Sequence, residues 1–250
     1  MSAAELLLLV LAGLGVGLVG SIAGLASLIS YPVLLAIGLP PVTANVTNTV
    51  ALVFSSGGSA LGSRPELSGQ GTRLARLGVV AVLGGVIGGL LLLITPPGAF
   101  KLIVPWLIAS ASMAILVPRR PQEVHWVDPG SEPIGLTVGV FLVAVYGGYF
   151  GAAAGVLMLA MLLASTRASL PRSNAIKNVV LGLANAMAAV TFILFSAIHW
   201  FLVAPLALGC FAGGRLGPLV VRHAPVRPLR IAIALAGIGL AIHLGIDAYR

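Results

Sequence analysis

Apolar runs follow one another along this chain and leave almost no sequence for a soluble domain. They cover Leu6–Leu39, Val50–Leu61, Leu77–Ile94, Phe100–Val117, Ile134–Ala164, Val179–Ile198, Phe201–Val221 and Leu229–Ile246. Several approach the ~20 residues with which a helix spans a bilayer. Only 8% of the residues are charged, against roughly 25% in an average soluble domain. The sequence therefore predicts an all-α polytopic membrane protein.

A polar interval, residues 118–133, divides the chain into a first membrane repeat, 1–117, and a second, 134–250. Its charged residues stand among prolines and a glycine, which is typical of a solvated linker. Gly20 and Gly24 match Gly151 and Gly155 at an offset of 131 residues, and "LPPVTA" matches "LPRSNA" at the same offset. Each half thus reads as a long glycine-broken segment followed by three helices.

The basic residues indicate how the two halves are oriented. If each glycine-broken segment were one span, the 14 Lys and Arg would divide six against eight. If both segments enter the membrane and return, twelve lie on one side and only Lys101 and Arg250 on the other. The second division agrees with the enrichment of Lys and Arg in cytoplasmic loops. We therefore expect two inverted repeats with both chain ends outside the cytoplasm.

The lengths of the two broken segments, Leu6–Leu39 and Ile134–Ala164, favour re-entrant hairpins. Two full spans need roughly 17–25 residues each, which neither segment supplies. Whether the segments re-enter or span is left open by the sequence. Because no basic residue precedes the first segment, we expect it to be a mature membrane segment and not a cleavable signal peptide.

Glycines at the two breaks, Gly20, Gly24, Gly151 and Gly155, suggest a binding site. Irregular backbone at mid-membrane is tolerated where it is buried in protein or lines an aqueous cavity. The half-helices that start after each break would present free N–H groups and a positive dipole end, which favour an anion. The alternative is that these glycines only allow close helix packing.

A polar stripe in the second half extends this hypothesis. On a helix that starts at Pro171, Asn174, Asn178 and Asn185 lie on nearly the same face, and Lys177 lies to one side of it. We predict that these four residues bind the substrate, because a lysine within a membrane segment requires a partner. The alternative for Lys177 is that its side chain snorkels to the interface.

The matching first-half sequence, "TANVTNTV", offers hydroxyls and amides. We expect Thr43, Thr47 and Asn48 to contribute to the same substrate site, since such donors bind an oxyanion without adding a full charge. A second first-half stripe contains Asn45, Asn48, Ser55, Ser56 and Ser59. For the serines of this stripe we favour hydrogen bonding between helices.

The absence of other chemistry narrows the function. The six acidic residues lie in loops or near segment ends, so no buried carboxylate is predicted for a cation or a proton relay. We expect no cofactor, no bound metal and no enzymatic activity, although a pair such as Ser55 with His199 leaves an intramembrane enzyme as a weak alternative. The net charge of +8 follows from loop residues and does not indicate nucleic acid.

Four stretches of the chain carry a resemblance to a known family: "GSIAGLASLISYP", "LPPVTANVTNTVALVFSS", "GGYFGAAAGVLMLAM" and "LPRSNAIKN". In them the chain resembles the TauE/SafE family of sulfite exporters, and the resemblance extends over essentially its whole length. It implies export of a small sulfur oxyanion or organosulfonate across the bacterial inner membrane, with small anions and the lipid bilayer as partners. A homodimer is left open. Ala23, Ala26 and Ala153 stand where glycine is common in the family, which puts the substrate's size in question.

The sequence therefore predicts a transporter that exports a small anion, sulfite or an organosulfonate, through a midplane site between inverted repeats. Another small organic or inorganic anion is the alternative substrate.

Overall fold

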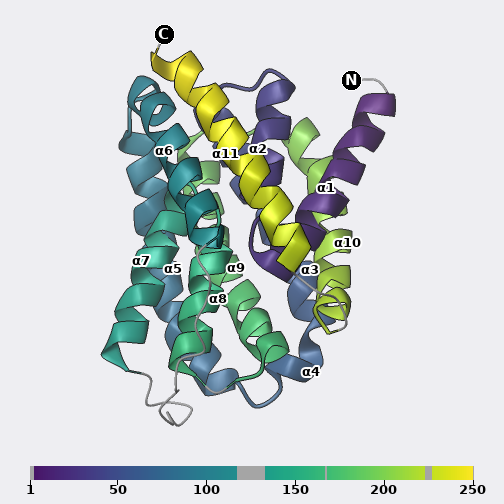
Figure 1. Cartoon of the computed structure of the whole chain (residues 1–250), viewed down its shortest axis with the longest axis vertical. Coiled ribbons are helices and arrows are strands. Elements are labelled where there is room, and N and C mark those ends of the chain that lie inside the picture. Colours follow the sequence, from purple (N-terminus) through teal and green to yellow (C-terminus); the bar gives the residue numbers. More distant parts are fainter. Residues whose placement is uncertain (1–2, 117–132, 167, 223–226, 250) are drawn as a thin grey trace.

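The computed structural model describes residues 3–116, 133–166, 168–222 and 227–249, and within these residues every regular element is a helix (Figure 1). The helices are α1 (Ala3–Ala23), α2 (Ser27–Ala36), α3 (Pro41–Gly62), α4 (Arg64–Leu67), α5 (Gly71–Ile94), α6 (Pro97–Leu116), α7 (Ile134–Tyr149), α8 (Ala154–Ser165), α9 (Leu170–Phe195), α10 (Trp200–Val221) and α11 (Arg227–Tyr249). The predicted all-α architecture is confirmed.

Both long apolar segments are broken, as the sequence predicted. The first break, residues 24–26, separates α1 from α2, and the second break, residues 150–153, separates α7 from α8. Gly24 has φ +74° and Gly151 has φ +72°, in the left-handed region that glycine adopts without steric cost. The chain reverses at each break, and α2 returns to the end of the molecule where α1 begins (Figure 1).

Helices of the first half pack mainly against helices of the second half. Helix α10 packs against α1 and α3, α5 packs against α7 and α9, and α6 packs against α11. Glycines make the close approach possible: a Cβ on Gly17 would lie 2.2 Å from the carbonyl oxygen of Cys210, and one on Gly88 would lie 2.1 Å from that of Val145. Such small-residue faces are typical of membrane helix interfaces. The two-repeat division stays a prediction, and this exchange of partners agrees with it.

Many large apolar side chains are exposed on the bundle, and many polar side chains are buried inside it. In the described part of the chain four helices, α1, α5, α9 and α10, are long and apolar enough to cross a bilayer. Asn45, Thr47 and Asn48 on α3 are at most 1% exposed. Large apolar side chains such as Phe201 and Leu208 are exposed instead, an arrangement that suits lipid outside the bundle. The chain is a multi-pass membrane protein.

The two chain ends lie at the same end of the molecule, with α4 at the opposite end (Figure 1). Sequence reasoning did not predict the one-turn helix α4. Arg222, just after α10, donates to Glu66 of α4 from Nε at 2.7 Å and from Nη2 at 2.9 Å, and so attaches α4 to α10. The predicted linker, residues 118–133, lies outside the described residues except for Pro133.

Candidate functional site

The two breaks meet backbone against backbone. A Cβ on Gly24 would lie 2.5 Å from the Cα of Gly155, and a Cβ on Gly155 would lie 2.4 Å from the Cα of Gly24. Only glycine at both positions permits this approach, because ordinary carbon contacts are about 3.5–4.0 Å. The contact brings the first turns of α2 and α8 to the same place, although these turns are more than a hundred residues apart in sequence.

Several backbone amides at this meeting point lack a backbone acceptor. Within the described residues, no backbone acceptor is found for the N–H groups of Ala26 and Ser27 at the start of α2 or of Gly155 in the first turn of α8. Helix N-termini leave such groups unsatisfied and carry the positive end of the helix dipole. Two helices therefore direct partial positive charge toward one region, which favours an anion there.

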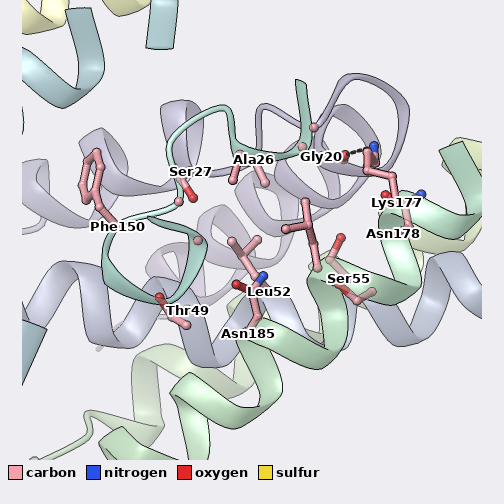
Figure 2. A pocket seen from close by; sticks show the side chains of 17 residues that line it. Gly20, Ala26, Ser27, Thr49, Leu52, Ser55, Phe150, Lys177, Asn178 and Asn185 are labelled. Atoms are coloured by element: carbon pink, nitrogen blue, oxygen red, sulfur yellow. Dashed lines mark hydrogen bonds between the residues drawn. The ribbon is translucent and has the colours of Figure 1, made fainter. Parts of the chain in front are cut away.

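A cavity of about 60 Å³ occupies this region and is called the central cavity below (Figure 2). Since a space of roughly 10–15 Å³ accommodates one water, the central cavity has room for several waters or one small ion. Its walls come from both breaks, from α3 and from α9. The lining residues are Gly20, Gly24, Ala26, Ser27, Thr49, Leu52, Ser55, Ser56, Gly147, Phe150, Gly151, Ala154, Gly155, Lys177, Asn178, Leu181 and Asn185.

Lys177 is the charged residue of this lining. Its side chain is 1% exposed, and its Nζ donates to the carbonyl oxygens of Gly20 and Ser21, each at 3.3 Å. Figure 2 shows the hydrogen bond to Gly20. These carbonyls lie in the last turn of α1, where a cation is favoured by the helix dipole. The described lining contains no Asp or Glu. The described lining thus carries one positive charge and no negative one, and the ammonium that carries this charge is bonded to the end of α1.

The neighbouring asparagines of α9 are bound to α1. Asn174 donates from Nδ2 to the carbonyl oxygen of Ser21 at 2.8 Å, and Asn178 donates to the same oxygen at 3.1 Å. Asn178 also donates to Oγ of Ser59 at 2.6 Å. Both N–H groups of the Asn178 amide are therefore used, and its contribution in this conformation is to hold the end of α1 in place.

Other polar side chains of the lining are available to a ligand. Ser55 on α3 and Asn185 on α9 make no side-chain hydrogen bond to another described residue. Figure 2 shows Ser55 and Asn185 with their polar atoms beside the cavity. Hydroxyl and amide groups can turn a donor toward an anion. The cavity thus combines three backbone amides, one ammonium and neutral donors.

The predicted site residues divide into two groups. Seven of them line the central cavity: Gly20, Gly24, Gly151, Gly155, Lys177, Asn178 and Asn185. Asn174 does not line it and instead donates to the carbonyl oxygen of Ser21. Thr43, Thr47 and Asn48 do not line it. Asn48 instead donates to Oγ of Ser27 at 3.1 Å and accepts a hydrogen bond from Ser30, both on α2. Whether any of these residues binds substrate stays a prediction.

Sequence reasoning missed lining residues on α3 and α2. Thr49, Leu52, Ser55 and Ser56 face the cavity, whereas the serines were expected to join helices. Only Ser59, which accepts from Asn178, matches that expectation. The spacing of Thr49, Leu52 and Ser56 by three and four residues is that of one helical face, and this signal was present in the sequence. Ser27 offered no comparable signal.

A helical membrane bundle with two broken segments that meet at a buried polar cavity has the architecture of a secondary transporter. The sequence profile of the TauE/SafE sulfite exporter family matches residues 9–244. The chain therefore belongs to the TauE/SafE family.

Curated relatives carry names that agree with this class. A probable membrane transporter protein, ORF9, from Sinorhizobium sp. is 25% identical over 232 residues, 92% of this chain and 88% of the relative. A probable membrane transporter protein from Haemophilus influenzae is 28% identical over 207 residues, 81% and 80% of the two chains. The Escherichia coli K12 protein YfcA, also named a probable membrane transporter, is 24% identical over 241 residues, 93% and 87% of the two chains. No solved structure matches the chain.

Proposed function

We propose that this protein exports a small oxyanion, sulfite or an organosulfonate, across the bacterial inner membrane. The central cavity is the substrate site, and its two halves come from two inverted repeats. The Gly24–Gly155 contact supports this proposal most strongly, because it places the N-termini of α2 and α8 at one cavity. The packing of first-half helices against second-half helices and the shared location of the two chain ends agree with inverted repeats.

The lining supports an anion as the substrate. Unpaired amides of Ala26, Ser27 and Gly155 provide donors without a full charge, and Lys177 provides a single positive charge. One charge with neutral donors binds an anion strongly enough to admit it and weakly enough to release it. The volume of about 60 Å³ favours a compact ion such as sulfite over a long organosulfonate.

The direction of transport follows from charge and topology. Arg64, Arg76, Arg172 and Arg215 have exposed side chains, and α4, which begins with Arg64, lies at the end of the molecule opposite the chain termini (Figure 1). The enrichment of basic residues on the cytoplasmic side assigns that end to the cytoplasm. An inside-negative membrane potential then favours outward movement of an anion by about 2.3 kcal/mol per charge per 100 mV.

Flux measurements in proteoliposomes test the proposal. The purified protein is offered sulfite, sulfate, thiosulfate, sulfoacetate and acetate, with and without an imposed pH gradient, and empty liposomes measure leak. We expect saturable flux of sulfite or of a compact sulfonate. Flux that follows the pH gradient would assign proton coupling. Transport of cations without any anion would contradict the proposal.

A different anion is the alternative substrate. The donors of the central cavity do not distinguish sulfur from other oxyanions, because amides and an ammonium recognise oxygen atoms carrying negative charge. Selective flux of acetate in the same panel would assign the protein to carboxylate export and retain the site.

A further inference from the structure

A second cavity, of about 190 Å³, is lined by parts of α2, α3, α6 and α11, and the end of α11 lies where the chain termini are (Figure 1). This cavity is called the outer cavity below. Its walls are the C-terminal half of α2, the start of α3, the start of α6 and the end of α11. The lining residues are Tyr31, Leu35, Pro41, Lys101, Val104, Leu244 and Asp247.

An aromatic contact separates the two cavities. Phe150 lines the central cavity and Tyr31 lines the outer cavity. Their rings meet edge to face, with centroids 5.2 Å apart and an interplanar angle of 87°. Both side chains are 1% exposed. Phe100 supports the contact from α6, with its ring centroid 5.9 Å from that of Phe150.

The segment between the cavities is polar on one side of α2. Ser27 lines the central cavity, and Ser30, one turn later, precedes Tyr31. Asn48 binds both serines through its side-chain amide, donating to Oγ of Ser27 and accepting from Oγ of Ser30. These hydrogen bonds fix α2 against α3 and thereby position Tyr31 against Phe150. Asn48 is a positioning residue in this arrangement.

The two cavities differ in charge. Lys177 is the charged residue of the described central lining, whereas the outer cavity contains both Lys101 and Asp247. The Asp247 carboxylate lies 3.8 Å from Nε2 of His243. With one lysine and one aspartate the outer lining has no formal net charge, so it attracts an anion less strongly than the central lining does. Such a decrease favours release toward the end that carries the termini.

We propose that the outer cavity is the exit end of the anion path, and that the Tyr31–Phe150 contact is the barrier that closes the central cavity against it. This inference rests on the proposed function for the direction and the kind of ligand. The barrier opens when the two rings separate, and nothing covalent changes.

Thiol labelling from the side of the termini tests the barrier. Cys210 is replaced by alanine, and Thr49→Cys then places one thiol in the lining of the central cavity (Figure 2). A membrane-impermeant anionic methanethiosulfonate is added to oriented vesicles, whose sidedness is established by a tag at the C-terminus. Leu35→Cys in the outer cavity is the positive control and should react rapidly in every background.

We expect Thr49→Cys to react slowly while both rings are present. Tyr31→Ala or Phe150→Ala should increase its labelling rate about tenfold. A tenfold change corresponds to about 1.4 kcal/mol, which is near the upper end of the interaction energy of an edge-to-face ring pair. Tyr31→Phe retains the ring contact and should react as slowly as the parent. Phe192→Ala truncates another fully buried ring and should also leave the rate unchanged.

The inference is overturned if the Tyr31 and Phe150 variants leave the rate unchanged, or if Phe192→Ala raises it equally. If the alanine variants do not accumulate, Tyr31→Leu removes the ring while retaining apolar volume, and the same comparison decides. Labelling needs no transported substrate. If anion flux is found but the labelling rate does not depend on the two rings, only the barrier is refuted. If the labelling rate depends on the rings but no anion flux is found, only the proposed function is refuted.

Discussion

Gly155→Ala perturbs the meeting of the two breaks and changes little else. Gly155 is the second residue of α8 and has no positive φ, so alanine is locally favourable there by up to about 1 kcal/mol of helix propensity. The new Cβ would lie 2.4 Å from the Cα of Gly24. Since carbon atoms approach to about 3.5 Å, the two breaks must separate by about 1 Å.

A displacement of this size moves the amides of α2 relative to those of α8. Misplacement of binding groups by about 1 Å can reduce a rate about 100-fold, and we expect a loss of this order in anion flux into proteoliposomes. The melting temperature of the purified variant, measured in parallel, reports whether the bundle remains folded. Gly24→Ala should be more damaging, because the alanine must also adopt φ +74°.

Gly15→Ala is the matched control. Gly15 lies in α1, and a Cβ there meets no described atom within 4 Å. This variant should transport at the wild-type rate. A folded Gly155→Ala protein with wild-type flux would refute the conclusion that the two breaks jointly form the site.

Three further predictions concern the strain at one break, an ion pair and the topology. Ala153 has φ +56°, so Ala153→Gly should stabilise the protein by about 0.5–1 kcal/mol; a lower melting temperature would contradict this assignment of strain. The hydrogen bonds from Arg222 lower the pKa of Glu66 below its usual 4.5. The ion pair therefore stabilises the folded state above pH 4.5. This stabilisation is lost as the pH falls through the lowered pKa of Glu66. Glu66→Gln should therefore reduce the free energy of unfolding at pH 7 by about 0.5–1 kcal/mol, which a lower melting temperature would report. The difference in melting temperature between variant and wild type should vanish in acid. A difference that persists in acid would exclude the ion pair as its cause. Reporters fused to the two chain ends should both indicate the non-cytoplasmic side, and a cytoplasmic C-terminus would contradict the re-entrant topology.

The sequence was sufficient to predict the class of protein and the location of the breaks. Apolar runs of membrane length led to the helical bundle, and the glycines at 24 and 151 led to the reversals of the chain. Both signals are local, because they depend on the composition or backbone freedom of neighbouring residues. The repeat offset added long-range information by pairing Gly24 with Gly155, whose backbones are in contact.

The partners of polar side chains could not be predicted in the same way. Asn48 and Ser55 both lie on α3, yet Asn48 binds α2 and Ser55 faces the central cavity. Which of them reaches the cavity depends on the rotation of α3 against α2 and α10. That rotation is set by packing among distant residues, such as Gly58 against Phe211 of α10, and no local pattern encodes it.

The stripe on α9 shows the same limit. The spacing of Asn174, Lys177 and Asn178 correctly placed them on neighbouring faces, but nothing in that spacing indicates that all three donate to the carbonyl of Ser21. An amide that binds backbone and an amide that binds substrate have the same spacing along a helix.

Sulfite binding to the Lys177→Met variant tests the central claim most directly. Methionine has a similar length and removes the ammonium, and a hydrogen bond to a charged group contributes about 1.5–3 kcal/mol. We therefore predict a dissociation constant about 10- to 150-fold higher than that of the wild type. Arg172→Gln, at an exposed position earlier in α9, should bind as the wild type does. Equal affinity in the folded Lys177→Met protein would contradict an anion site at the central cavity.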